Sequence, residues 1–395
     1  MCTLVVKEAV QYYLNNGSDV AGCFLDATKA FDRIRYDRLF DLLLERQMSA
    51  IDLRALKNLY SRQTARVVWD GTYSNEFTCT NGIRQGGIAS PILYTVYIDE
   101  LLFRLQRKGL GCWIGTHYVR SICYADDLTL LCPSLNGLQG MINECESFAR
   151  QYGMEYNPRK SACIYFSRKK RNTTPFRILL NGSEVPWVNK IKHLGNMLCS
   201  DLSERIEISQ KRGDLVGRVN RLLASVGDAP EKIILKLFSS QCCHFYGCQA
   251  WNMMDRNVED FHTMWNRCLR RLLNLHPRTH VRYLIRLADM QHSKTMILMR
   301  FRKMVESMQN NKNNTLVKFL ACRGKQDADT LIGKNMTYIN KMVDATKPND
   351  VQLTLYECTK EELCTIKTIK ELRCSSVESW GTLEKQTFID FLCIF

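Results

Sequence analysis

The chain has 395 residues, 45% of them hydrophobic, so it can bury a sizeable core, which argues against global disorder. Its 55 Lys and Arg outnumber its 40 Asp and Glu, which gives a formal net charge of +15. This excess favours a polyanionic partner, and nucleic acid before a membrane surface.

No segment reaches the roughly 20 apolar residues that span a bilayer, and Lys7 and Glu8 interrupt the N-terminal apolar run. The 18 cysteines are scattered through apolar segments without a C-x-x-C pair, which favours reduced thiols over a disulfide framework. We therefore expect an intracellular protein, nuclear or cytoplasmic, that is neither secreted nor membrane-bound.

The first elements mix strands and helices. Residues 19–26, "DVAGCFLD", are typical of a buried strand that ends in an acid, and helical apolar spacing begins at Asp37. A hairpin is expected around Asp70-Gly71. The glycine-rich turn in "NGIRQGGIASPILY" leads into a helix with Ser90 as its N-cap and Pro91 in its first turn.

A second hairpin is predicted with strands near 119–124 and 128–132, followed by a helix from about Leu138 to Tyr152 that ends at Gly153. Short strands are expected in "SACIYFS", "FRILLNG" and "NKIKHLGNML". From Asp201 onward, basic and apolar residues interleave at helical spacing. The predicted fold class is therefore α+β, with an antiparallel sheet and helices, followed by an all-α part.

The segment "CYADDLTLLC" places two carboxylates, Asp126 and Asp127, side by side in the second hairpin. Like charges about 4 Å apart repel by roughly 4 kcal/mol at an effective dielectric of 20, so solvent or a cation must offset them. Asp is also common in ordinary turns. Asp26 ends another apolar strand, and neighbouring strands would bring it against Asp126. Three carboxylates would then hold two Mg²⁺ ions, as in a nucleotide polymerase.

Five segments resemble, in order, the palm motifs of reverse transcriptases, most of all those of non-LTR retrotransposons (the long interspersed element type). They are "FLDATKAFDRI", "NGIRQGGIASPILYTVYIDELL", "CYADDLTLLC", "GMEYNPRKSACIYF" and "IKHLGNML". The resemblance covers about residues 19–200. It implies an RNA-directed DNA polymerase that adds dNTPs to a DNA primer on an RNA template, using two Mg²⁺ ions for which Mn²⁺ substitutes.

The resemblance also implies a domain order. Residues 1–200 would form the palm with partial fingers, 201–285 a helical thumb-like domain, and 286–395 a helical C-terminal region without an assigned role. Family members normally carry a fingers segment, and many an endonuclease domain, before the first motif. Because only 25 residues precede Asp26, an N-terminally truncated element is expected.

Position by position, the resemblance makes Asp26, Asp126 and Asp127 the catalytic metal ligands, and the backbone carbonyl of Ala27 completes one coordination sphere. Phe31 matches an aromatic steric gate, a ring under the sugar that leaves no room for a 2′-hydroxyl. The alternative is that Phe31 begins the hydrophobic face of the next helix.

Arg84, Gln85, Gly86 and Gly87 match a motif in which the backbone approaches the nascent base pair, while the glutamine steadies template or nucleotide and the arginine meets phosphate. The alternative is an ordinary glycine turn before a helix. Lys160 matches a lysine that protonates the departing pyrophosphate, although a lone lysine after a turn is usually solvated.

His193, Leu194 and Gly195 match the primer grip, near the primer 3′ end. Four arginines of the later helical region would contact phosphates along a thumb, unless their helix only faces solvent. They are Arg267, Arg270, Arg271 and Arg278.

Other functions remain as alternatives. A truncated, catalytically inactive descendant would bind RNA or DNA through its charge and polymerise nothing. A viral RNA-dependent RNA polymerase shares the palm and the paired acids, and Asp32 resembles the acid with which those enzymes sense a ribose hydroxyl, but the ring of Phe31 argues against it. Group II intron and retron-type relatives fit the downstream "LHPRTH" segment poorly.

Overall fold

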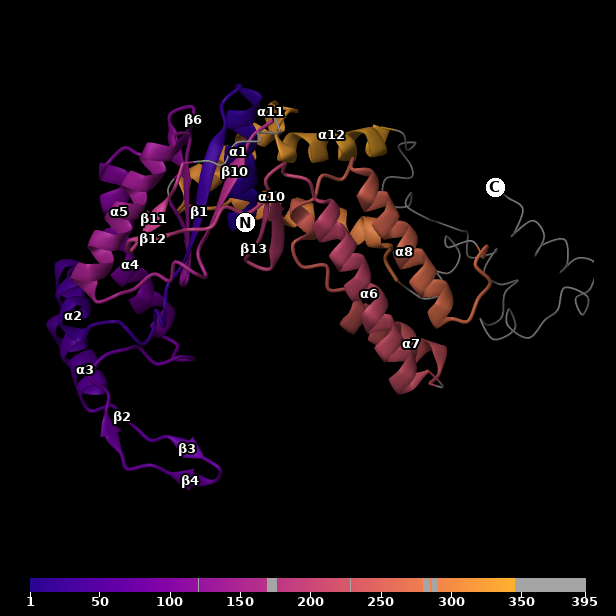
Figure 1. The fold of residues 1–395 in the computed structure, drawn as a ribbon. Coiled ribbons are helices and arrows are strands. Elements are labelled where there is room, and N and C mark those ends of the chain that lie inside the picture. Colours follow the sequence, from indigo (N-terminus) through magenta and orange to yellow (C-terminus); the bar gives the residue numbers. More distant parts are fainter. Residues whose placement is uncertain (120, 169–175, 228, 280–284, 286–289, 345–395) are drawn as a thin grey trace, which may run out of the picture. The chain divides into compact units, whose positions relative to one another are not determined.

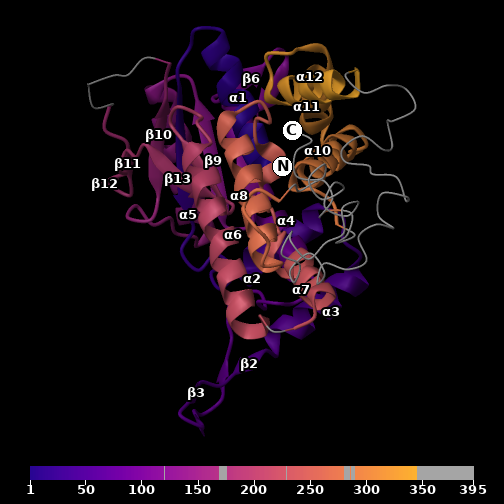
Figure 2. The same cartoon turned by 90° about the vertical axis from the view of Figure 1, so that its right-hand side faces the viewer.

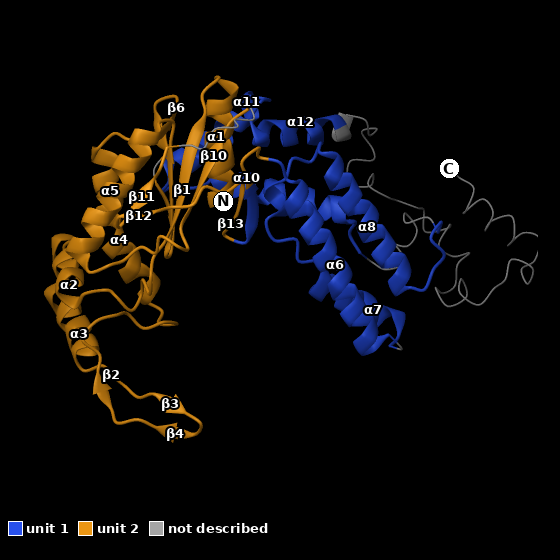
Figure 3. Ribbon diagram, viewed as in Figure 1, with its two compact units in different colours: residues 1, 195–198, 203–395 blue, residues 2–194, 199–202 orange. Residues whose placement is uncertain are grey.

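The computed structural model describes residues 1–395 except 120, 169–175, 228, 280–284, 286–289 and 345–395 (Figure 1). The chain divides into two compact units (Figure 3). Unit 2 comprises residues 2–194 and 199–202, and unit 1 comprises residues 1, 195–198 and 203–395. Each unit is described by itself.

Unit 2 combines helices with an antiparallel sheet. Its helices are α1 (Cys2–Asn15), α2 (Tyr36–Glu45), α3 (Ala50–Ser61), α4 (Ser90–Arg107) and α5 (Leu135–Tyr152). Its four-stranded sheet is made of β1 (Val20–Asp26), β8 (Ile122–Tyr124), β9 (Asp127–Cys132) and β10 (Ala162–Phe166). The strand order is β10-β1-β9-β8 with every neighbouring pair antiparallel, so β1 and β9 occupy the middle of the sheet.

Short two-stranded ribbons complete unit 2. They are β2 (Thr64–Ala65) with β5 (Phe77–Thr78), β3 (Val68–Trp69) with β4 (Thr72–Tyr73), β6 (Cys112–Ile114) with β7 (His117–Val119), and β11 (Leu179–Leu180) with β12 (Ser183–Glu184). β13 (Lys190–His193) also lies in unit 2, and β14 (Asn196–Cys199) begins in unit 1. The predicted hairpin at Asp70-Gly71 is confirmed: both residues have positive φ, 47° and 74°, as a type I′ turn requires.

Side chains of the β1–β9 pair alternate between two faces. One face, the core face, carries apolar cross-strand pairs and packs with α4 and α5 into the main hydrophobic core (Figure 1). These pairs are Ala21–Cys132, Cys23–Leu130 and Leu25–Leu128. The opposite face carries Phe24 beside Thr129 and, at the strand ends, Asp26 beside Asp127. The alternation thus directs these two acids away from the core.

Helix ends follow local chemistry. α5 ends at Gly153, as predicted, with φ of 73° in the left-handed region that glycine tolerates best. Its N-cap is Ser134, whose hydroxyl accepts a hydrogen bond from the Gly137 N–H. The prediction that Ser90 caps α4 was wrong: Ala89 is the N-cap, and the Ser90 hydroxyl donates to the Arg84 carbonyl instead (2.6 Å).

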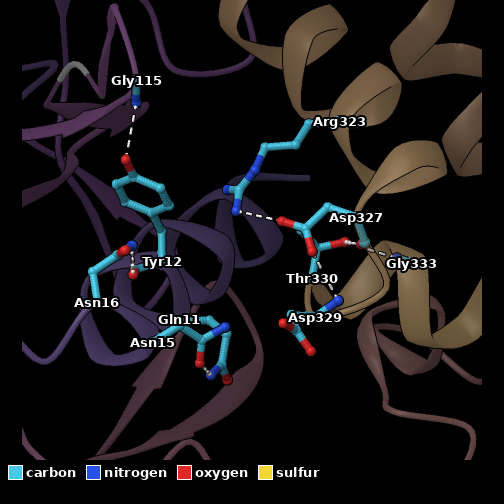
Figure 4. Close-up of polar contacts among 10 residues, drawn as sticks. All are labelled: Gln11, Tyr12, Asn15, Asn16, Gly115, Arg323, Asp327, Asp329, Thr330 and Gly333. Atoms are coloured by element: carbon cyan, nitrogen blue, oxygen red, sulfur yellow. Dashed lines mark hydrogen bonds and ion pairs between the residues drawn. The ribbon is translucent and has the colours of Figure 1, made fainter.

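α1 was not predicted, yet it is a regular helix anchored to the β6–β7 ribbon. The hydroxyl of Tyr13 accepts a hydrogen bond from the Trp113 N–H (2.8 Å), and that of Tyr12 accepts one from Gly115 (3.4 Å, Figure 4). The sequence signal was present as the helical spacing of Val6 and Val10.

Unit 1 is helical over its described residues from Ser203 onward, which confirms the predicted all-α part. Its helices are α6 (Arg205–Val226), α7 (Glu231–Leu237), the π-helix η1 (Phe238–Cys242), the 3₁₀ helix η2 (Cys248–Ala250), α8 (Arg256–Leu272), α10 (Ser293–Gln309), α11 (Thr315–Gln326) and α12 (Leu331–Asp344). α6 and α8 lie side by side (Figure 2), and Arg271 bonds Asn220 between them (2.7 Å). Arg323 and Asp327 form an ion pair at the end of α11 (2.7 Å, Figure 4). None of the helices described in either unit combines the length and apolar character needed to cross a membrane.

Candidate active site

Neighbouring strands bring two acids together as expected, but the partner of Asp26 is Asp127 rather than Asp126: these two residues lie directly opposite each other at the ends of β1 and β9. The backbone N–H of Asp26 donates to Ser161 Oγ (3.1 Å), and its carbonyl accepts from the Asn157 N–H (2.9 Å). Because both backbone groups of Asp26 are used on the β10 side, Asp26 and Asp127 form a non-hydrogen-bonded pair. In such a pair the side chains share one face and stand close, with Cα atoms about 4.5 Å apart.

Asp126 is held beside this pair by the β8–β9 turn. Tyr124 pairs with Asp127, so Ala125 and Asp126 are the two turn residues. Ala125 has φ of 52°, a left-handed conformation that costs a residue with a β-carbon on the order of 1 kcal/mol. The tight turn therefore places the second acid at the exposed end of the sheet at some cost in strain.

The three acids interact electrostatically. Partial burial raises the pKa of the Asp127 carboxyl, and the negative charges of Asp126 and Asp26 raise it further. Like charges placed opposite each other destabilise a strand pair. The end of the β1–β9 pair is therefore a place where a cation would relieve repulsion.

The donor atoms at this site suit a divalent cation. Magnesium takes oxygen ligands, typically one or two carboxylates together with substrate phosphates. Over the described residues, no three His, Cys, Asp or Glu side chains form a ready-made metal-binding group. The candidate carboxylates of Asp26, Asp126 and Asp127 share one end of the sheet but do not form such a group in this structure. Ala27, which follows Asp26 in the chain, is bridged to Tyr156.

The turn that contains Lys160 is fastened to Asp26. Besides accepting from the Asp26 N–H, Ser161 Oγ donates to the Asn157 carbonyl (2.8 Å), and the Lys160 N–H donates to the same carbonyl (3.3 Å). The Lys160 side chain is exposed. The structure thus brings Lys160 into a turn bonded to the backbone of one of the candidate metal ligands.

Phe31 lies in the segment between β1 and α2. Its partly buried ring stacks on Tyr94 of α4, with ring centroids 5.0 Å apart and an interplanar angle of 18°. The Phe31 carbonyl accepts a hydrogen bond from the Ile83 N–H (2.9 Å). Since α2 begins only at Tyr36, the alternative that Phe31 starts the next helix is wrong.

The loop that contains Gln85, Gly86 and Gly87 is exposed and follows directly on Ile83. Gly86 has φ of 82°, and a β-carbon added at Gly87 would lie 2.8 Å from Ser90 Oγ, so both positions favour glycine. The side-chain amide of Gln85 donates to Asp32 Oδ1 (3.5 Å). These contacts place the loop beside the Phe31 segment.

Exposed Arg84 supplies part of the same loop through its backbone. The carbonyl of Arg84 accepts hydrogen bonds from the Gly87 N–H (3.0 Å) and from the Ser90 hydroxyl. This arrangement fastens the loop to the start of α4 and leaves the Arg84 side chain exposed.

The residues matched to the primer grip differ in exposure. His193 is only 4% exposed, and its Nδ1 and Nε2 lie 3.2 Å from the hydroxyls of Thr3 and Thr129. Burial lowers the pKa of His193 to about 4, so the imidazole is a neutral core group. Leu194 and Gly195, by contrast, are a turn with positive φ, 48° and 80°. Of these three residues, the histidine is thus buried, whereas the turn is accessible to solvent.

The helical arginines also differ from one another. Arg267 and Arg271 are exposed on α8, and Arg278 is exposed in the turn that follows. Arg270 donates through Nε to the Thr279 carbonyl (2.7 Å), and burial lowers its pKa. The guanidinium of Arg270 thus binds a nearby backbone carbonyl.

Sequence reasoning missed Tyr94, Asn157 and Ser161. Tyr94 stands four residues into the predicted helix, where its aromatic ring is indistinguishable in sequence from ordinary core. The bonds of Asn157 and Ser161 to Asp26 depend on the pairing of β1 with β10, which no local pattern reveals.

Comparisons with known proteins identify related sequences. Residues 4–198 match the family model described as "Reverse transcriptase (RNA-dependent DNA polymerase)". The Pol polyprotein of the type-1 retrotransposable element R2 of Nasonia vitripennis is 29% identical over 136 residues, which cover 34% of this chain and 13% of the relative. The probable RNA-directed DNA polymerase of the transposon X-element of Drosophila melanogaster is 24% identical over 253 residues. These residues cover 62% of this chain and 27% of that relative. The chain therefore spans about an eighth and about a quarter of the length of these two relatives.

Among solved structures, apo telomerase from Candida tropicalis is similar with a TM-score of 0.39 and 11% identity, covering 89% of this chain and 56% of that one. The predicted order of an antiparallel sheet with helices and then a helical region is found in the described residues. Residues 4–198 belong to the reverse transcriptase family of RNA-directed DNA polymerases, and their relatives include polymerases of non-LTR retrotransposons.

Proposed function

We propose that the chain is an RNA-directed DNA polymerase of the non-LTR retrotransposon type, which extends a DNA primer with dNTPs on an RNA template. Reverse transcriptases generally bind an RNA template and use divalent metal ions. The observation that carries the proposal is the register that sets Asp26 opposite Asp127, with Asp126 in the adjoining turn.

Asp26, Asp126, Asp127 and the Ala27 carbonyl would hold two Mg²⁺ ions, for which Mn²⁺ substitutes. The chemistry such ions would supply is activation of the attacking 3′-hydroxyl and stabilisation of the leaving oxygen of the triphosphate. The three carboxylates would attract the ions electrostatically. Because the carboxylates repel one another in the metal-free protein, binding of a cation would also relieve that repulsion.

Further residues of unit 2 would orient the nucleotide. Phe31 would lie under the sugar and exclude a 2′-hydroxyl, and the Gln85–Gly87 backbone would approach the base pair from beside it. Arg84 is exposed for phosphate contact. Lys160, in the turn fastened to Asp26, would donate a proton to the departing pyrophosphate.

The proposed division of the chain follows the sequence resemblance. Residues 1–200 would be the palm with partial fingers, 201–285 the thumb, and 286–395 a further helical region, of which 345–395 lie outside the described residues. The turn at Leu194-Gly195 would meet the primer end. Exposed Arg267, Arg271 and Arg278 would contact phosphates of the template–primer duplex.

Primer extension tests the proposal. We expect the full chain to extend a DNA primer on an RNA template with dNTPs and Mg²⁺, and Asp126→Asn to lose extension while still binding the duplex. Asp260→Asn, an exposed acid of α8 in unit 1, is the matched control for loss of one charge and should extend normally. Equal extension by the parent and Asp126→Asn would remove these acids from the proposal.

A second candidate function is nucleic-acid binding without polymerisation. It is favoured by the net charge of +15, which suits a polyanionic partner. Salt-dependent binding of the template–primer by the parent, without extension in Mg²⁺ or Mn²⁺, would support this alternative.

A further inference from the structure

The ring contact between Phe31 and Tyr94 links the proposed sugar gate to the rigid interior. The rings are nearly parallel, at 18°, with centroids 5.0 Å apart. Phe31 is partly buried, whereas Tyr94 is only 3% exposed and belongs to the hydrophobic core between the sheet and α4. One face of the Phe31 ring is therefore supported by a fixed side chain.

The backbone of Phe31 is held separately from its ring. Its carbonyl accepts the hydrogen bond from Ile83, and the neighbouring Ile34 carbonyl accepts one from Gly82 (2.8 Å). These bonds fix where the side chain starts but leave rotation about χ1 and χ2 free. The Phe31 ring stacks on Tyr94, and because aromatic pairs favour defined geometries, this stack favours one orientation of the Phe31 side chain.

Tyr94 is also suited to its position near the acids. Burial raises the pKa of the Tyr94 phenol, and the nearby Cys123, Asp126 and Asp127 act in the same direction. The side chain therefore remains neutral and adds no negative charge beside the carboxylates. It supports Phe31 without competing for a cation.

We propose that Tyr94 is a specificity-determining positioning residue, whose stacked ring holds Phe31 in the orientation that excludes a ribose 2′-hydroxyl. This inference rests on the proposed polymerase function and on Phe31 as the gate. Tyr94 itself touches no substrate: it acts through the Phe31 ring. Its removal should therefore change the choice of sugar more than the rate with dNTPs.

The test is the ratio of kcat/KM for a dNTP to that for the matching rNTP, measured by primer extension with the full chain. We expect Tyr94→Leu to lower the ratio about tenfold, the scale of losing one aromatic pair. Tyr94→Phe keeps the stacked ring and should keep the ratio. Tyr94→Met, whose longer and more flexible side chain adapts to irregular core gaps, provides a second variant without a planar ring if Tyr94→Leu fails to fold.

Two controls separate positioning from general damage. Tyr97, one turn later on α4, is fully buried and stacks on no gate, so Tyr97→Leu should lower the thermal stability and leave the ratio unchanged. In a Phe31→Ala background, which should itself admit rNTPs more readily, Tyr94→Leu should have no further effect on the ratio, because coupled residues are not additive.

The outcomes distinguish this inference from the function on which it rests. If the parent extends no primer, the proposed function fails. If the parent is active and Tyr94→Leu slows dNTP and rNTP use equally, Tyr94 is an ordinary core residue and the positioning role is overturned. An equal further loss of the ratio in the Phe31→Ala background would also overturn it.

Discussion

The two faces of the β1–β9 pair differ in what they contribute to the molecule. On the core face, apolar pairs such as Cys23–Leu130 are fully buried against α4 and α5. On the opposite face, polarity rises toward the strand ends, from Phe24 beside Thr129 to Asp26 beside Asp127.

This difference follows from the period of two in a strand. Neighbouring residues serve opposite needs, since Leu25 stabilises the fold while Asp26 weakens it through repulsion with other acids. The apolar contacts of the core face hold β1 and β9 together despite the repulsion between the acids at the strand ends. Substitutions on the two faces should therefore separate stability from activity.

The largest effect is expected from Asp26→Asn. Removing one carboxylate from the candidate metal site should reduce primer extension about 10³-fold, the scale of losing an electrostatic catalytic group. Because the side chain lies at an open strand end, circular dichroism and thermal unfolding should change little. A large loss of stability in this variant would contradict the separation of the two faces.

On the core face, Leu130→Ala should have the converse effect. Leu130 is fully buried, so truncation leaves a cavity and should lower the free energy of unfolding by about 3 kcal/mol. Denaturant unfolding measures this change. At a temperature where the variant remains folded, its extension rate should stay near that of the parent, and a 10³-fold loss there would break the comparison.

Between these extremes lies buried His193, which bonds Thr129 on the polar face. Burial lowers the pKa of the folded imidazole to about 4, against about 6.5 when unfolded. Its contribution to stability is therefore complete above about pH 6.5 and is lost as the pH falls toward 4. Between pH 7.5 and pH 5 the parent should lose up to about 2 kcal/mol more than His193→Gln in denaturant unfolding. Parallel pH profiles for the two proteins would contradict this.

The smallest effect is expected from Asp127→Asn without divalent metal. The folded pKa of Asp127 is raised, so the parent loses stability as the pH rises through the range above the ordinary Asp value. The variant should then unfold about 1 °C higher at pH 7.5, because the group is largely solvated. The gain should vanish at acidic pH, and Mg²⁺ should stabilise the parent alone.

Much of the local structure could be predicted from the sequence. The strand ending at Asp26, the helix ending at Gly153 and the hairpin at Asp70-Gly71 follow from periodicity and from residues that tolerate positive φ. The paired acids at Asp126 and Asp127 were visible as an unusual charge between apolar strands. In each case the signal lies within a few neighbouring residues.

The parts that could not be predicted depend on pairing between distant segments. The burial of His193 requires β9 and α1 to come together around it, and the role of Ser161 requires β10 to lie beside β1. The cap of α4 was misplaced by one residue because the Ser90 hydroxyl is used by the Arg84 carbonyl. Such competition among partners is a property of the folded chain.

Because the turn between β8 and β9 consists of two residues, Ala125 and Asp126, we expect small insertions there to disrupt the strand pairing. One extra residue inserted into β9 would shift its register against β1 by a single position. Every following side chain of β9 would then point to the opposite face of the sheet. A carboxylate would be driven into the apolar interior while a leucine emerged beside Asp26. Length variation should therefore be confined to other connections of unit 2.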